Sequence, residues 1–130
     1  MLSESKTFST RIKTILVVED DGDMSEVMYM TLSEEPSFHP IIINSAFEAL
    51  ELAPRIMPDL FILDYLLAGM NGIELYDRLH ATPGLEKIPT IITSASLYVH
   101  RLQIDDRHLT GLEKPFDLDI LLQTVKQVVG

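Results

Sequence analysis

Short apolar runs alternate along the chain with segments in which apolar residues recur at helical spacing. Residues 13–18 and 59–63 are almost wholly apolar or β-branched, which is typical of strands buried on both faces. Weaker runs over 40–43, 90–93 and 109–113 predict three further short strands. Strands separated in this way by helical segments indicate a parallel sheet with helices on both of its faces.

Helical patterns occur over residues 24–34, 46–53, 73–80, 97–106 and 117–129. Ser45 can cap the second helix, and Pro54 is expected to mark its end. The helix over 97–106 has poor periodicity, so we expect it to be short or mobile. Because crossovers between parallel strands are right-handed, few arrangements suit such a chain. We predict one α/β domain with a doubly wound, five-stranded parallel sheet in the order 2-1-3-4-5.

Polar residues follow these strands at the same end. Glu19 and Asp20 follow the first strand and Asp64 the central one, while Ser94 and Lys114 follow the fourth and fifth. The carboxyl ends of parallel strands meet at one edge of the sheet, where open α/β folds bind their ligands. Carboxylates gathered around a lysine suit a divalent cation and a phosphoryl group. We therefore place the chemistry of the chain at this edge, with Asp64 at its centre.

Composition narrows the choice of function. A chain of 130 residues suits one domain with a full core, and its net charge of −10 argues against direct binding to nucleic acid. The absence of cysteine excludes disulfides and thiolate metal sites and fits a cytoplasmic protein. No apolar run approaches the roughly 20 residues of a membrane span, so we expect no membrane insertion. Residues 1–11 are polar and read as a flexible tail before a domain over 12–130.

Five short motifs occur along the chain in a fixed order. They are Ile-Leu-Val-Val-Glu-Asp-Asp (15–21), Pro-Asp-Leu-Phe-Ile-Leu-Asp (58–64), Met-Asn-Gly (70–72), Pro-Thr-Ile-Ile-Thr-Ser-Ala (89–95) and Glu-Lys-Pro-Phe (113–116). Each motif is weak by itself, but as a set they resemble the receiver domain of two-component response regulators, in the CheY-like superfamily. The resemblance extends over residues 13–129 and supports a flavodoxin-like strand order.

The resemblance implies that Asp64 is the phosphoacceptor. It would take a phosphoryl group from a histidine kinase or a phosphotransfer protein and become an aspartyl phosphate. Lys114 would supply a counter-charge to the phosphate, and its peptide bond to Pro115 is usually cis in this family. Ser94 would donate the hydrogen bond that acts as the switch signal. Thr93 is the competing hydroxyl, but the family pattern places alanine directly after the switch residue, and here that alanine follows Ser94.

The resemblance also implies a magnesium site. Glu19, Asp20 and Asp64 are hard oxygen ligands that repel one another when they are close, and Mg²⁺ relieves that repulsion. The family adds the backbone carbonyl of Leu66 as a further ligand. Asp21 is a competing acid, which its register assigns to the rim of the site.

The chain departs from the family pattern in several places. The family usually carries an aromatic residue three positions before the lysine, which moves inward when the hydroxyl binds phosphate; here that residue is Gly111. Ala68 replaces the usual proline in the loop after Asp64, and the segment over 96–109 is short. The apolar Leu66, two residues beyond Asp64, should hinder an attacking water. Our hypothesis is therefore a long-lived phosphoryl state.

These features predict a response regulator receiver that is not an enzyme beyond slow self-catalysed phosphorylation and dephosphorylation. No output segment follows Gly130, so we expect a stand-alone receiver that switches the binding of a downstream protein or relays phosphate. A homodimer through the fourth and fifth helices is left open. So is a docking module of the same fold in which phosphorylation is lost or uncoupled, because Gly111 has no side chain to move.

Two other functions of similar folds disagree with residues near the acidic pair. A metal-dependent phosphatase would need a second acid at Leu66, and a flavin-binding domain would not tolerate the acidic cluster beside a phosphate. The four histidines (His39, His80, His100 and His108) have no metal-like spacing, so we expect all of them at the surface.

Overall fold

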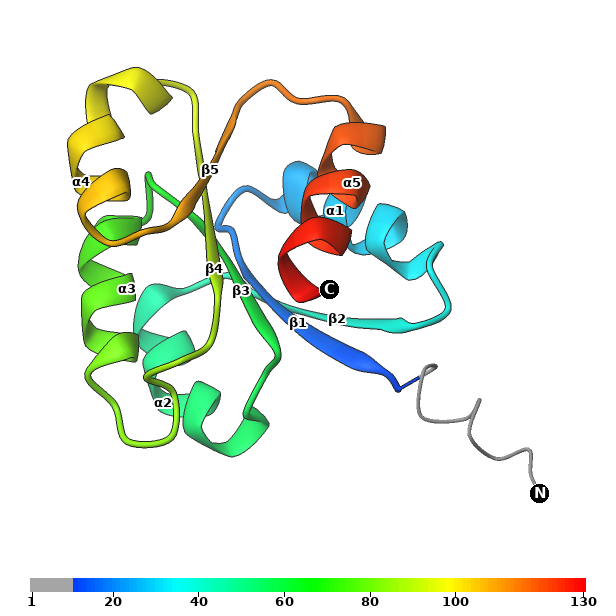
Figure 1. Cartoon of the computed structure of the whole chain (residues 1–130), viewed down its shortest axis with the longest axis horizontal. Coiled ribbons are helices and arrows are strands. Elements are labelled where there is room, and N and C mark those ends of the chain that lie inside the picture. The colour runs from blue at the N-terminus through cyan, green and yellow to red at the C-terminus, as the bar shows by residue number, and fades with distance from the viewer. Residues whose placement is uncertain (1–10) are drawn as a thin grey trace.

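Parallel strands form a single sheet in the order β2-β1-β3-β4-β5, which confirms the predicted fold class and strand order (Figure 1). The protein is described by a computed structural model over residues 11–130. The strands are β1 (Lys13–Val18), β2 (Phe38–Ile43), β3 (Leu60–Asp64), β4 (Thr90–Ser94) and β5 (Thr110–Glu113). The helices are α1 (Gly22–Ser33), α2 (Ala46–Ile56), α3 (Gly72–His80), α4 (Arg101–Asp106) and α5 (Leu118–Val129), with a 3-10 turn, η2 (Leu97–His100), before α4.

The predicted N-terminal tail lies outside the described residues except for Arg11. The guanidinium of Arg11 lies 3.0 Å from the carboxylate of Asp59, at the entry to β3. Within residues 11–130, no helix is both long enough and apolar enough to cross a bilayer.

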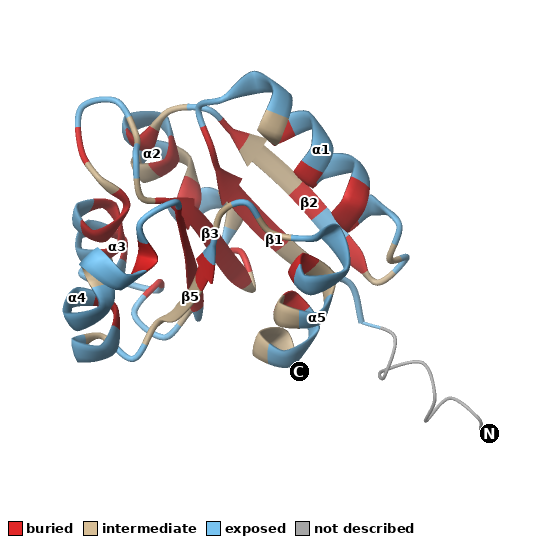
Figure 2. Cartoon of the chain, turned by 90° about the horizontal axis from the view of Figure 1, so that it is seen from above, coloured by how far each residue is buried: buried red, intermediate tan, exposed pale blue. Residues whose placement is uncertain are grey.

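Helices cover both faces of the sheet. Figure 1 shows α2, α3 and α4 on one side and α1 and α5 on the other. Leu16 and Val18 of β1 pack into the core on the first side, whereas Ile15 and Val17 pack into the core on the second. In Figure 2 the central strands are buried and the helices are exposed on their outer sides. Because both faces are buried, a one-residue slip would exchange the two sets of side chains, and this fixes the register.

The register places the ends of neighbouring strands side by side. Val18 pairs with Leu63, and Asp64 pairs with Thr93. Ser94 pairs with Glu113, the last residue of β5. The loops that follow these strands therefore leave the sheet at one common edge.

Side-chain caps start the helices close to this edge. Asp21 accepts a hydrogen bond from the Met24 amide at the start of α1, and Ser45 caps α2 as predicted. Asn71 and Glu74 form a reciprocal capping box at the start of α3. Asp21 thus serves the helix, which agrees with its expected place on the rim of the site.

The observed lengths of α2 and α4 test two predictions from the sequence. The expectation that Pro54 ends α2 was wrong, because the helix continues to Ile56, whose side chain packs on the core. Met57 then adopts a left-handed conformation and donates its N–H to the Ala53 carbonyl, which closes the last turn. The expectation of a short fourth helix is confirmed, since α4 has 6 residues.

Gly72, the first residue of α3, lies directly against the end of β3. A Cβ at this position would be 2.5 Å from the carbonyl oxygen of Asp64. The Gly72 amide also donates to the carbonyl oxygen of Tyr65 at 2.8 Å. Since the close neighbour is backbone, an added methyl group can fit only if α3 moves away from β3.

We therefore expect Gly72→Ala to lower the free energy of unfolding by about 1–3 kcal/mol, measured by urea denaturation. Gly22→Ala is the matched control, because nothing lies within 4 Å of a Cβ at Gly22, in the first turn of α1. That variant should be neutral, or stabilised by up to about 1 kcal/mol, since alanine favours a helix over glycine. Equal stability of the two variants would contradict the close contact at Gly72.

Candidate functional site

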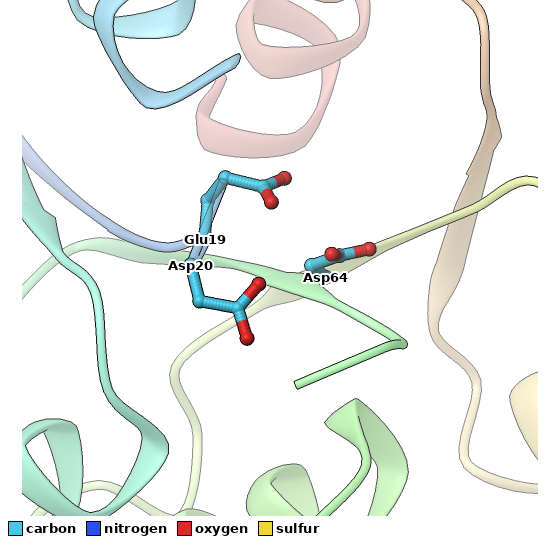
Figure 3. Close-up of side chains that lie close together, drawn as sticks. All are labelled: Glu19, Asp20 and Asp64. Atoms are coloured by element: carbon cyan, nitrogen blue, oxygen red, sulfur yellow. The ribbon is translucent and has the colours of Figure 1, made fainter. Parts of the chain in front are cut away.

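Three carboxylates meet where β1 and β3 end. Oxygen atoms of Glu19, Asp20 and Asp64 lie within 4.8 Å of one another. Figure 3 shows the three side chains gathered beside the ends of these two strands. Glu19 and Asp64 are buried, with exposed fractions of 1% and 7%, whereas Asp20 is exposed. The site therefore has two buried acids and one acid that is open to solvent.

Lys114 lies between the two buried acids. Its Nζ is 2.9 Å from Oε1 of Glu19 and 3.2 Å from Oδ1 of Asp64. The Lys114 amide donates to the Ser94 carbonyl at 2.8 Å, which fixes the residue just beyond β5. The peptide bond between Lys114 and Pro115 is cis, as the resemblance implied.

Burial and charge shift the ionisation of this group. Burial raises the pKa of the Glu19 carboxyl, and the negative charge of Asp64 adds to that rise, while the hydrogen bond from Lys114 opposes it. For Lys114, burial opposes the charged form, but the two carboxylates outweigh it and the pKa of the ammonium is raised. The lysine thus stays positively charged among acids that are short of positive charge.

Supporting side chains, which the sequence did not reveal, hold the turn after β1. Asn44 donates from Nδ2 to the Glu19 carbonyl at 2.8 Å. The Ser25 hydroxyl lies 3.0 Å from that carbonyl oxygen and 2.8 Å from the carbonyl oxygen of Asp21. Asn44 directly follows β2, and this position at the same edge of the sheet was the one feature of the sequence that could have indicated its contact with Glu19.

Both hydroxyl residues at the end of β4 are buried. Thr93 pairs in register with Asp64, and its carbonyl accepts a hydrogen bond from the Tyr65 amide at 2.8 Å. Ser94 is the last residue of the strand, and its Oγ accepts a hydrogen bond from the Ser96 amide at 3.0 Å. Ser94 thereby links the end of β4 to the segment that leads into η2.

The loop after Asp64 contacts the acidic cluster through its backbone. The Ala68 amide donates to Oδ2 of Asp20 at 3.1 Å. The Leu66 side chain is 73% exposed, so its apolar surface lies open near the site. The role of its carbonyl as a metal ligand stays a prediction.

Gly111 leaves space that another residue uses. A Cβ at Gly111 would lie 2.7 Å from Cδ1 of Leu97, a buried residue of η2. The side chain of Leu97 therefore occupies the volume next to β5 that a larger residue at position 111 would need.

His100 is not a free surface residue, contrary to our expectation for the four histidines. Its ring is half-buried and stacks on Tyr65, with the ring centroids 3.6 Å apart and the planes 17° from parallel. His39, His80 and His108 are exposed, as expected. No local pattern predicts this pair, because Tyr65 lies in the loop after β3 and His100 ends η2, 35 positions later.

The donor set suits a hard divalent cation. Carboxylate oxygens that lie close together bind Mg²⁺ well, and the exposed Asp20 leaves the cluster open to solvent on one side. The raised pKa of Glu19 also indicates that the cluster favours additional positive charge. The residues present therefore fit a magnesium site.

Comparison with known proteins agrees with this geometry. The chain matches the response regulator receiver domain over residues 15–126. A probable transcriptional regulator, ycf29 of Pyropia yezoensis, is 32% identical over 118 residues, which are 89% of this chain and 53% of the relative. The DNA-binding response regulator MtrA of Mycobacterium tuberculosis is 35% identical over 86 residues, 66% of this chain and 36% of the relative. The chain thus spans about a third to a half of the length of these relatives.

Solved structures show the same fold. A putative response regulator from Chloroflexus aurantiacus has a TM-score of 0.83 at 26% identity, with 92% of this chain and 98% of that chain covered. Chemotaxis protein CheY4 of Vibrio cholerae has a TM-score of 0.82 at 22% identity, with 90% and 98% covered, a likeness of fold alone. Since the receiver match extends from Ile15 to Lys126 and includes every residue of the acidic site, the chain belongs to the family of response regulator receiver domains.

Proposed function

We propose that this receiver accepts a phosphoryl group on Asp64 from a histidine kinase or a phosphotransfer protein. The observation that carries the proposal is the position of Lys114, whose Nζ contacts both Glu19 and Asp64 beside the acidic cluster. A carboxylate next to a fixed ammonium can approach an anionic phosphoryl group, because the lysine offsets the repulsion between them. Family membership supports two-component signalling as the setting.

In the proposed transfer, a carboxylate oxygen of Asp64 forms a bond to phosphorus. The bond from phosphorus to the imidazole nitrogen of the donor breaks, and the electron pair leaves with that nitrogen, which takes up a proton from water. The ammonium of Lys114 then contacts a phosphoryl oxygen and keeps its contact with Glu19. The hydroxyl of Ser94 donates a hydrogen bond to another phosphoryl oxygen while it accepts from Ser96, since one hydroxyl can do both.

Glu19, Asp20, Asp64 and the carbonyl of Leu66 would hold Mg²⁺ in this proposal. When bound, the cation neutralises charge on the carboxylates and on the transferring phosphoryl oxygens. Lys114 and the carboxylates bind and orient the phosphoryl group, and no general acid or base is required. We therefore propose a phosphoacceptor with slow self-catalysed turnover of its phosphate, and no enzyme activity on another substrate.

The output that we propose is a contact with a downstream protein or the relay of the phosphoryl group. The relative MtrA is named as a DNA-binding response regulator, but this chain covers 36% of its length. The net charge of −10 disfavours direct contact between this chain and nucleic acid. Phosphorylation would then act by changing how this chain binds another protein, and a second copy of the chain is one such partner.

A second function, a docking module in which phosphorylation is uncoupled from output, is favoured by one observation. Gly111 has no side chain, and Leu97 fills the space beside it. A movement of a side chain at position 111 toward Ser94 is therefore not available to this protein.

Phosphorylation can be tested with acetyl phosphate and Mg²⁺, followed by intact mass measurement. We expect the parent to gain one phosphoryl group and Asp64→Asn to gain none, because the amide cannot act as the acceptor. Asp21→Asn is the matched control, since Asp21 lies beside the acidic pair but caps α1, and asparagine caps as well as aspartate does. That variant should be phosphorylated like the parent.

Two results would overturn this proposal. One is a phosphoryl gain that persists in Asp64→Asn, which would place the acceptor elsewhere. The other is no gain in the parent with acetyl phosphate or with phosphorylated histidine kinases, even though Mg²⁺ binding is confirmed by calorimetry. The second result would favour the docking module.

The lifetime of the phosphorylated form tests the role of Leu66. Its exposed apolar side chain stands two residues beyond Asp64, where it disfavours an ordered attacking water. We expect Leu66→Asn to speed dephosphorylation at least threefold, roughly 0.7 kcal/mol in the barrier, when loss of the phosphoryl mass is followed over time. Leu66→Met should keep the parental rate. Equal rates in Leu66→Asn and the parent would exclude this role.

A further inference from the structure

Three contacts hold the segment between β4 and α4. Oγ of Ser94 accepts the Ser96 amide at 3.0 Å, the Leu97 side chain lies against Gly111, and the His100 ring stacks on Tyr65. The first contact joins this segment to the end of β4, the second to β5, and the third to the residue after β3. The third one reaches the residue directly after the proposed phosphoacceptor.

Two backbone hydrogen bonds and packing on the core hold Tyr65 in place relative to the end of β3. Its amide donates to the Thr93 carbonyl at 2.8 Å, and its own carbonyl accepts from the Gly72 amide at 2.8 Å. The side chain is half-buried and packs on the core beneath α2, α3 and α4. A shift at the end of β3 must therefore move the Tyr65 ring with it.

His100 stands at the junction between η2 and α4. Because α4 has 6 residues, its own hydrogen bonds are few and its position depends on contacts with the rest of the chain, among them the fully buried side chain of Ile104. At the C-terminal end, Arg107 makes two hydrogen bonds to the Asp77 carboxylate, at 2.7 and 2.9 Å. At the N-terminal end, the stack of His100 on Tyr65 is one anchor, beside the packing of Leu97 against Gly111.

The segment that these contacts hold, residues 97–106, carries exposed apolar surface. Tyr98, Val99 and Leu102 are 78%, 64% and 78% exposed. A change at the N-terminal anchor would alter how these side chains are presented, while the Arg107 anchor stays in place.

We propose that His100 is a positioning residue that couples the phosphoacceptor end of β3 to residues 97–106 through its stack on Tyr65. This proposal rests on the proposed function and describes how phosphorylation of Asp64 would be transmitted. Gly111 has no side chain for such a coupling, and Leu97 belongs to the segment that must move. Because coupling between two sites is reciprocal, loosening the stack should also change how the segment responds to a group bound at Asp64.

The test compares His100→Ala with two other variants. His100→Phe keeps a ring that can stack and should rescue the parental behaviour. His80→Ala is the matched control, because His80 also stacks on a tyrosine, Tyr76, but within α3 and with centroids 5.2 Å apart. Amide hydrogen exchange of residues 97–106 is measured first without added ligand. A stacked pair of this kind predicts about two- to tenfold faster exchange in His100→Ala.

The second measurement adds Mg²⁺ and beryllium fluoride, an unreactive mimic of a phosphoryl group. In the parent and in His100→Phe, exchange of residues 97–106 should change when the mimic binds. In His100→Ala that change should fall to less than half, although fluorine NMR shows that the mimic is bound. The His80→Ala control should respond like the parent.

The outcomes separate this inference from the proposed function. If the parent binds neither the mimic nor a phosphoryl group, the proposed function fails and the coupling fails with it. If the parent binds the mimic and His100→Ala responds as fully as the parent, only the role of His100 is overturned. A loss of the response in His80→Ala as well would also overturn it, because the effect would then reflect general stability.

Discussion

Repulsion between the carboxylates of Glu19, Asp20 and Asp64 is the constraint on which the rest of this structure depends. Acids this close disfavour one another, and two of them are also removed from water. The fold tolerates them because Lys114 supplies a positive charge between the buried pair. That charge comes from the far edge of the sheet, so the strand order and the register of β4 on β5 are what place it there. The acidic site is therefore a property of the whole sheet.

Much of the fold and of the site could be predicted because short local patterns in the sequence indicate both. Apolar runs that end in polar residues locate the carboxyl ends of strands, and parallel strands bring those ends together. This is why Glu19, Asp64 and Lys114, which are far apart along the chain, could be assigned to one place. The predicted end of α2 was wrong for a related reason. In a local pattern a proline predicts the end of a helix. Here α2 continues past Pro54, which has no N–H to donate, because Ile56 packs on the core.

Contacts between loops could not be predicted in this way. The stack of His100 on Tyr65 depends on the path of two irregular segments, for which the sequence has no periodicity. The space beside Gly111 shows the same limit, because a glycine reveals a missing side chain but not which residue fills the volume. The contacts of Asn44 and of Ser25, in α1, were also not predicted, since both side chains bond to the Glu19 backbone carbonyl and not to its carboxylate. Local patterns thus located the reactive groups, while the surroundings that hold them arise from packing in three dimensions.

The ion pair between Glu19 and Lys114 joins residues that are 95 positions apart. Such a contact closes most of the chain into one loop, and contacts of this range are among the slowest to form during folding. Neither half of the protein holds a complete site, because the acids come from β1 and β3 and the base follows β5. A nascent or partly unfolded chain would present Asp64 without its lysine. Under the proposed function, competence to accept phosphate would therefore arise only in a completely folded chain, and incomplete molecules would not draw phosphate out of a signalling pathway.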